Sequence, residues 1–177
     1  MRSDIIQIDN QGNGFDRAVE ETRRVARYQG LDQKQSLRLQ LCTEEMLSLA
    51  RSVTGELNAS FFMECEGGNV ELHMTTKTVM DKEKRYNLLS SATSRKNEAA
   101  GSFIGKLRDA FEQAMLSEAD HTYYELPDAV IRDVSGQYVD DPEWDRYEQS
   151  TLRRLADNVK ISIIGGTVDM TVTKHFE

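Results

Sequence analysis

Two glycine pairs, each flanked on both sides by alternating apolar and polar residues, constrain this sequence most strongly. Gly67-Gly68 separates residues 59–66 from residues 70–77, and Gly165-Gly166 separates residues 159–163 from residues 168–172. Adjacent glycines favour tight turns, and alternation with a period of two places apolar side chains on one face of a strand. The sequence therefore predicts two β-hairpins whose antiparallel strands are buried on one side.

Two segments near the N-terminus have the spacing of amphipathic helices. Residues 15–26 place apolar side chains at steps of four and three, and Gly30 follows as a typical helix-ending residue. Asp32 is a suitable N-cap for the next helix. The apolar stripe of that helix is the most regular in the chain and comprises Leu39, Cys42, Met46, Leu49 and Val53. Each helix is expected to turn one face toward a core.

The remaining segments have weaker patterns. Ile5, Ile6 and Ile8 predict a first strand, and residues 103–114 and 144–155 predict further helices. Residues 78–101 predict a lid-like loop, because no period is visible from Asp81 to Gly101. Residues 117–147 predict an insertion with short strand segments at 121–126 and 129–134.

This order of elements predicts the fold class. Hairpins supply antiparallel pairing, and helices with a single apolar face are expected to cover one face of the resulting sheet. The expectation is a two-layer α/β sandwich with a mixed, mainly antiparallel sheet. A length of 177 residues suits a single domain that spans residues 1–177.

Charge and cysteine usage exclude several classes of protein. The formal net charge is −8, so the chain is expected to repel nucleic-acid phosphates and anionic membrane surfaces. Cys42 and Cys65 lack the spacing of metal ligands, and we interpret both as small apolar core residues. Neither a secretory signal nor an apolar run of membrane-spanning length is visible, so a cytoplasmic location is expected.

The residues from Gly30 to Leu47, GLDQKQSLRLQLCTEEML, resemble a helix of the GHKL superfamily of ATP-binding domains, which have the Bergerat fold. The resemblance is greatest to the histidine-kinase-like branch that contains the anti-sigma-factor serine kinases. Val159 to Lys174 is similar to the closing hairpin of that branch, with Gly166-Thr167 at the turn. The element order also matches, so the resemblance covers most of the chain outside the insertion.

The resemblance implies a set of residues for catalysis and metal binding. In the family, a helix Glu acts as general base, and an Asn four residues later completes a Mg²⁺ site. Glu45 takes the place of the base, because it lies at the shoulder of the apolar stripe whereas Glu44 points nearly the opposite way. Leu49 stands where the Asn is expected, and Leu cannot bind a metal ion. A register shifted to Glu44 would place Ser48 there instead.

The resemblance also implies positions that bind the nucleotide. An Asp-x-Gly at the end of the third strand recognises adenine in the family, whereas Thr76, Lys77 and Thr78 stand there in this sequence. Thr167 holds the family-equivalent position in the last hairpin. Gly101 and Gly105 flank the start of a helix, where backbone N–H groups can bind an anion, although Gly101 is explained equally well as the end of a loop.

Three functions follow as hypotheses. The first is a degenerate GHKL-like domain that acts as a regulatory or protein-binding module in bacterial-type signalling or transcription control, without a cofactor. The second is an active ATPase or serine kinase with a non-standard Mg·ATP site built on Glu45, Thr76 and the turn at Gly101. The third is a structural module that forms a homodimer. The sequence contains no Walker loop, nucleophile elbow or zinc-ligand spacing.

Overall fold

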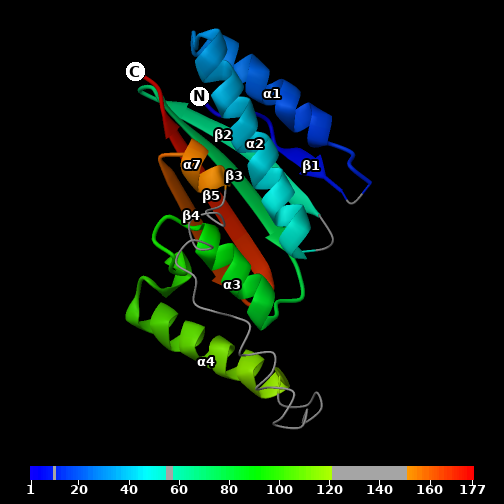
Figure 1. Cartoon of the computed structure of the whole chain (residues 1–177), viewed down its shortest axis with the longest axis vertical. Helices are drawn as coiled ribbons and strands as arrows, with labels where there is room; N and C mark the ends of the chain where they lie inside the picture. The colour runs from blue at the N-terminus through cyan, green and yellow to red at the C-terminus, as the bar shows by residue number, and fades with distance from the viewer. Residues whose placement is uncertain (10, 55–57, 121–150) are drawn as a thin grey trace, which may run out of the picture.

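The computed structural model describes residues 1–9, 11–54, 58–120 and 151–177 (Figure 1). The first half contains β1 (Ile6–Ile8), α1 (Phe15–Tyr28), α2 (Gln33–Thr54), β2 (Ala59–Glu66) and β3 (Asn69–Lys77). The second half contains α3 (Lys82–Ser91), the 3₁₀ helix η1 (Glu98–Ala100), α4 (Phe103–Asp120), α7 (Thr151–Leu155), β4 (Asn158–Ile164) and β5 (Thr167–His175).

The described strands form one antiparallel sheet in the order β1-β2-β3-β5-β4. Both predicted hairpins are present, as β2–β3 and β4–β5. They join through β3 and β5, where Leu72 lies opposite Val172 and Met74 lies opposite Met170. The glycine pairs therefore predicted the hairpins correctly, and the pairing of the two hairpins with each other places the C-terminal strand β5 inside the sheet, between β3 and β4.

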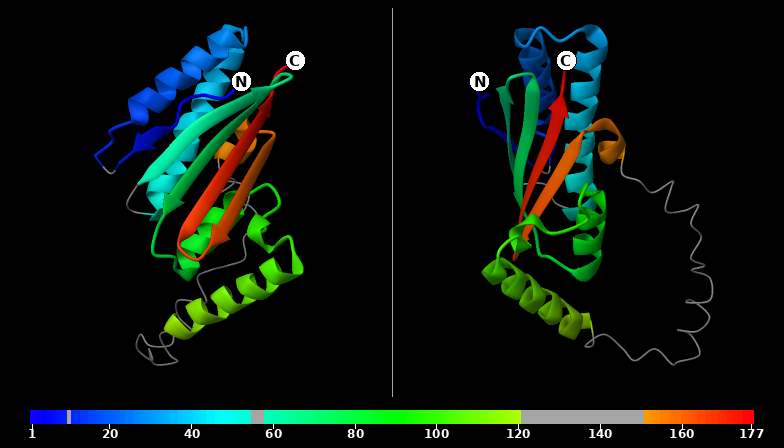
Figure 2. Two further views of the ribbon diagram at one scale, coloured as in Figure 1. Left: turned by 180° about the vertical axis from the view of Figure 1, so that it is seen from behind. Right: turned by 90° about the vertical axis from the view of Figure 1, so that its left-hand side faces the viewer.

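The molecule has two layers. Figure 2 shows α1, α2, α3 and α7 on one side of the sheet. Burial alternates along each long strand, with the buried side chains on the helix-covered face and the polar ones on the other. The expected two-layer α/β sandwich is therefore confirmed, with a sheet that is antiparallel throughout the described strands. Within the described residues, no helix combines the length and the apolar character needed to cross a membrane.

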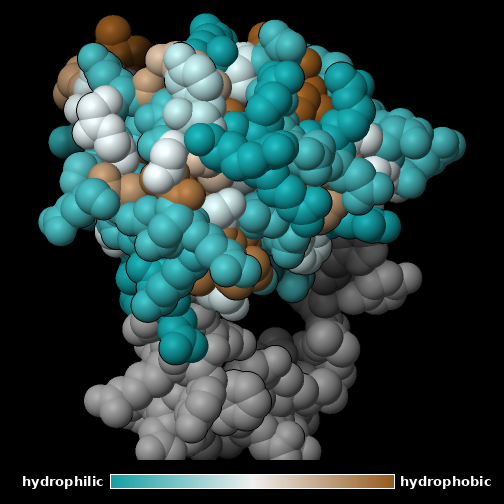
Figure 3. Space-filling model, turned by 90° about the horizontal axis from the view of Figure 1, so that it is seen from above, coloured by the Kyte–Doolittle hydropathy of each residue, from teal (hydrophilic) through white to brown (hydrophobic). Residues whose placement is uncertain are grey.

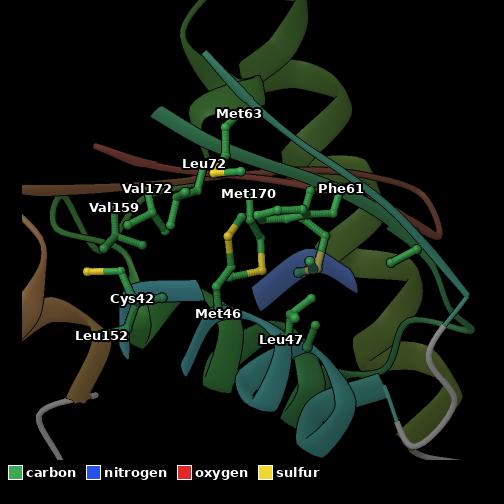
Figure 4. Packing of buried hydrophobic residues seen from close by; sticks show 14 of the residues in the cluster. Cys42, Met46, Leu47, Phe61, Met63, Leu72, Leu152, Val159, Met170 and Val172 are labelled. Atoms are coloured by element: carbon green, nitrogen blue, oxygen red, sulfur yellow. The ribbon is translucent and has the colours of Figure 1, made fainter. Parts of the chain in front are cut away.

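The core lies between α2 and the sheet. Figure 4 shows Met46 and Leu47 of α2 next to Phe61 and Met170 of the sheet, and all four are fully buried or nearly so. Burying a side chain of this size stabilises the fold by about 1.5–3 kcal/mol relative to leaving it exposed. The predicted α2 stripe is buried at Leu39, Cys42 and Met46 and half-buried at Leu49, and the side chain of Val53 lies outside the description.

The predicted end of α1 and the predicted N-cap of α2 are both present. Gly30 ends α1 with a φ of 70°, which lies in the left-handed region that glycine adopts readily. Asp32 Oδ1 accepts a hydrogen bond from the Gln35 backbone N–H at 2.7 Å, and Gln35 Oε1 accepts one from the Asp32 N–H at 3.0 Å. This reciprocal capping satisfies two backbone donors that the helix leaves unpaired.

The predicted lid-like loop at residues 78–101 is wrong in part. Its first half contains α3, capped by Asp81, whose side chain accepts a hydrogen bond from Lys84 N–H at 2.8 Å. The buried side of α3 comprises Arg85, Leu88 and Ser91. Only one of these three residues is apolar, so hydropathy has no visible helical period and the helix escapes detection.

The predicted helix at 103–114 exists as α4, but the expectation that it covers the sheet is wrong. α4 crosses one end of the sandwich, as Figure 1 and Figure 2 show, and packs mainly on η1 and also on α3. The predicted insertion at 117–147 begins within α4, which extends to Asp120. The rest of that insertion, including its strand segments, lies outside the described residues.

Candidate functional site

The acids of α2 lie on the two shoulders of its buried face. Glu44 and Glu45 are both half-buried, because Thr43 and Leu47 are buried together with Cys42 and Met46. The buried face is thus wider than the predicted stripe, and burial does not favour Glu45 over Glu44. Burial raises the pKa of the Cys42 thiol to about 11, and the negative charge of Glu45 adds a smaller increase.

The positions expected to bind magnesium and adenine are used by the fold itself. Leu49 packs against the hydrophobic core. Thr76 is 2% exposed, and its hydroxyl donates a hydrogen bond to the Asn58 carbonyl at 3.0 Å. These side chains therefore have structural partners, and neither contributes a carboxylate or an amide to a ligand site.

The closing hairpin also has a structural explanation. Thr167 lies opposite Lys77 at the end of β3. The Thr78 N–H donates to the Gly166 carbonyl at 2.8 Å, and a Cβ added at Gly166 would lie 2.4 Å from the Thr78 carbonyl oxygen. Gly166 is therefore required for the close approach of two backbone segments, whether or not a phosphate binds nearby.

The two glycines at the start of α4 lie in a different part of the molecule. Gly105 N–H donates to Ser102 Oγ at 3.0 Å, and a Cβ at Gly105 would lie 2.2 Å from the Ala99 carbonyl oxygen. Gly105 thus allows α4 to pack on η1. Gly101 has a φ of −66°, which any residue adopts. α2 and α4 make at most minor contacts with each other, so Gly101 and Gly105 lie apart from Glu45 and Leu49. The hairpin turn beside Thr167 does contact α4, through the Gly165 N–H and Glu112.

Sequence reasoning missed a polar junction between α3 and α4. The Arg85 guanidinium donates to the Asp109 carboxylate, and both side chains are largely buried. Asn97 Nδ2 also donates to Asp109 at 2.5 Å. Burial by itself would raise the pKa of Asp109, but the hydrogen bonds from Asn97 and Arg85 outweigh it and lower the pKa. The carboxylate therefore stays charged within the junction.

Two further contacts tie this junction to the sheet. Asn97 Nδ2 donates to the Ile163 carbonyl at 2.9 Å, and Asn97 Oδ1 accepts from the Ile163 N–H at 2.8 Å. The Asn97 side chain thus pairs with the edge strand β4 as a neighbouring strand would. Glu112 of α4 accepts from the Gly165 N–H at 3.1 Å. The side of α4 that faces the sandwich is therefore polar, apart from Gly105 and the half-buried Leu116.

The opposite side of α4 is apolar and exposed. We call it the α4 apolar face, and its members are 52–82% exposed: Phe103, Ile104, Leu107, Phe111 and Met115. Figure 3 views the other end of the molecule, where hydrophilic colours dominate and hydrophobic ones form small separate areas. The sequence shows the apolar stripe of α4, but its spacing alone does not reveal that the stripe points outward.

The open face of the sheet holds residues that could bind a cation. Ligand atoms of Glu64, Glu71 and His73 all lie within 4.8 Å of one another. His73 Nε2 lies 3.3 Å from the Glu71 carboxylate, and the His73 ring stacks on Phe62. Arg2 lies 3.6 Å from the Glu64 carboxylate and already offsets part of its charge. Glu64 and Glu71 face each other across β2 and β3, so a positive neighbour stabilises this pair.

Comparison with known proteins gives no family. No protein-family model matches this sequence, and no curated protein matches it.

Proposed function

We propose that this chain is a regulatory protein-binding module, built on an ATP-binding type of sandwich that lacks a working Mg·ATP site. Its docking surface is the α4 apolar face. The observation that carries the proposal is the orientation of α4, which turns its polar side toward the domain and its apolar side toward solvent.

This orientation is held in place by specific contacts. Asp109 pairs with Arg85, Glu112 accepts from the Gly165 backbone, and Gly105 fits against Ala99. Turning the helix to bury its apolar side would break all three. Large contiguous apolar patches on soluble proteins usually mark interaction sites. A partner that covers this face would gain the free energy of apolar burial.

The missing nucleotide ligands support the same proposal. A Mg·ATP site of the GHKL type needs hard oxygen ligands for the metal ion and an acidic group for adenine. Leu49 and Thr76 stand at those positions, and the fold uses both internally. The scaffold is thus suited to a role that depends on its surface, such as the anti-sigma-factor type of control in which one protein holds another.

The charge of the chain indicates what kind of partner binds. A net charge of −8 opposes the approach of a second copy and favours a partner of net positive charge. A single exposed helix with an apolar stripe is suited to packing against another amphipathic helix. The proposed partner is therefore a basic protein that supplies an amphipathic helix.

The nucleotide part is tested by thermal unfolding of the purified chain with Mg·ATP, Mg·ADP and Mg²⁺ alone at millimolar concentrations. A ligand that binds only the folded state raises the melting temperature. We expect no change. A saturable, Mg²⁺-dependent rise would contradict the proposal and would support the enzyme hypothesis on Glu45 and Thr76.

The partner part is tested by comparing the wild-type chain with the Leu107→Glu variant as baits in an extract of the organism that carries it. Lys160→Glu, an exposed change on the sheet, is the matched control. A captured protein is then purified, and its affinity is measured for all three baits. We expect the affinity for the partner to fall at least about tenfold in Leu107→Glu alone, since central apolar side chains contribute most of the binding free energy of an interface.

Sedimentation of the same three proteins separates the alternatives. The proposal expects wild-type monomers. A wild-type dimer that Leu107→Glu dissociates would overturn it in favour of a second copy on the α4 apolar face. Weak side-chain footprinting of this face in a pure monomer would overturn it as well, because the face would then be covered by the chain itself.

A further inference from the structure

Among the cavities beside α3 and α4, two share Arg85 and Leu116 in their walls. The first has a volume of about 330 Å³ and is lined by residues of α3 and α4 together with Arg95. The second has a volume of about 300 Å³ and is lined mainly by apolar side chains, among them Val79, Met80 and Phe111. Such volumes are at the small end of the range for ligand sites.

The first cavity is positively charged. Arg85 and Arg95 both line it, and none of the described residues in its wall is acidic. The ion pair with Asp109 offsets part of the charge of Arg85. This concentration of positive charge stands out in a chain whose net charge is −8. A cluster of cations around a partly enclosed cavity attracts anions, because the low dielectric of the walls strengthens the field.

Arg85 has a donor without a partner. Its side chain is 6% exposed, and one guanidinium nitrogen, Nη2, donates to Asp109. The other nitrogen, Nη1, is buried and has no hydrogen-bond partner among the described residues. A buried unpaired donor is unfavourable, because it has lost its hydrogen bonds to water without gaining others. An anionic oxygen at this position would satisfy the donor through a charge-assisted hydrogen bond.

Arg95 adds a second unusual feature at the same cavity. Its φ is 54°, and it is the one non-glycine residue in the described part of the chain with a positive φ. Residues held in this region are strained and are concentrated at ligand sites. The conformation places an exposed guanidinium beside the cavity that Arg85 lines from within.

We propose that these two cavities form a binding site for a small amphipathic anion. The carboxylate or phosphate head group lies in the first cavity against Arg85 and Arg95, and the apolar body lies in the second cavity against Val79 and Met80. This site does not depend on the proposed protein partner, although Phe111 and Met115 belong both to the second cavity and to the α4 apolar face.

The test uses titration calorimetry of the full chain with octanoate, octyl phosphate, 1-octanol and inorganic phosphate, all below micelle-forming concentrations. We expect saturable binding of octanoate or octyl phosphate and much weaker binding of 1-octanol and inorganic phosphate. The stronger of the two binders identifies the head group. Equal binding of 1-octanol would overturn the proposal, because the cations would then have no role.

Three variants locate the site. Arg95→Gln should weaken binding of the preferred anion about tenfold, since it removes one charged donor. Val79→Ser should weaken it by a similar factor through the apolar body, and it leaves the α4 apolar face unchanged. Lys160→Gln is the control and should bind as the wild type does. Unchanged affinity in both Arg95→Gln and Val79→Ser would place the ligand elsewhere and overturn the proposal.

The buried guanidinium is tested with Arg85→Met, whose folding is checked first by circular dichroism and thermal unfolding. A folded Arg85→Met chain should lose anion binding almost completely. If this variant does not fold, Arg95→Gln and Val79→Ser decide the proposal by themselves. Because Leu107→Glu lies outside both cavities, it should abolish partner binding but retain anion binding, so the two proposals fail independently.

Discussion

Arg85 of α3 and Asp109 of α4 form an ion pair in which the two side chains are 6% and 15% exposed. The residues are separated by 24 positions in the chain, and the pair joins two helices that otherwise make few contacts. Asn97 extends the junction to the edge strand β4. The orientation of the α4 apolar face therefore depends on a buried polar contact rather than on hydrophobic packing.

Replacing one member of this pair should destabilise the protein more than replacing both. Asp109→Leu leaves the Arg85 charge buried without its partner, which typically costs about 3–5 kcal/mol, whereas an apolar pair of similar volume is often nearly neutral. Unfolding in urea of Asp109→Leu, Arg85→Met and the double variant measures the coupling. Additive effects of the two single changes would show that the ion pair is not energetically important.

The two glycines at the start of α4 should respond differently to the same substitution. Gly105→Ala places a methyl group 2.2 Å from the Ala99 carbonyl oxygen, so α4 must move away from η1. Such overpacking typically costs about 1–3 kcal/mol. Gly101→Ala meets the Glu98 carbonyl only at 3.4 Å and should change the unfolding free energy little. Equal effects in thermal unfolding would refute the packing role of Gly105.

The Cys42 thiol should be almost unreactive in the folded protein. Its pKa is raised to about 11, mainly by burial, so about one thiol in a thousand is ionised at pH 8. Burial also raises the pKa of Cys65. The thiols should react slowly with a coloured disulfide reagent in buffer and rapidly in urea. The Cys42→Ala variant then shows which of the two reaction rates belongs to Cys42. Fast labelling of the native protein would show that the core near Cys42 opens readily.

Asp157 should contribute to stability above its ordinary pKa of 3.8 and lose that contribution in acid. Burial tends to raise its pKa, but the His175 N–H and the Lys174 ammonium outweigh this and lower it. A group whose pKa is lower in the folded state stabilises the fold above the unfolded pKa, and the gain disappears as the pH falls through the folded pKa. Because this carboxylate is partly exposed, we expect less than about 1 kcal/mol.

The Asp157 prediction is checked by measuring the urea unfolding free energy between pH 7 and pH 2. Asp157→Asn should be less stable than the wild type at neutral pH, and the difference should shrink as the pH falls below about 4. A difference between the two proteins that stays constant over this range would contradict the assignment.

Elements with strong local signals could be predicted from the sequence. The alternation around Gly67-Gly68 and Gly165-Gly166 predicts both hairpins, and the strand ends agree with the observed ones within one residue except at the end of β5, which extends three residues further to His175. Gly30 and Asp32 mark the junction of α1 and α2 because capping depends on residues only a few positions apart. The two-layer arrangement follows, since strands and helices with one apolar face have few other ways to bury it.

The helix α3 and the polar junction could not be predicted in the same way. Arg85 is a charged residue at a buried position, so the hydropathy pattern contains no helical period there. Its partners Asp109 and Asn97 lie on other segments, and nothing in the local sequence links them. The candidate anion site depends on Arg85 and Arg95, which only the tertiary structure places at one cavity, so this site could not be predicted from the sequence.

The sequence by itself determined both hairpins and the helices α1, α2 and α4, because side-chain periodicity and capping act over a few residues. It also shows Leu49 and Thr76, and neither an Asn nor an Asp, at the positions that the GHKL resemblance would assign to metal and adenine binding. Only the tertiary structure decided which side of α4 faces the sandwich. Periodicity shows that a helix has an apolar side, but distant contacts such as the one between Arg85 and Asp109 decide whether that side meets the core or the solvent.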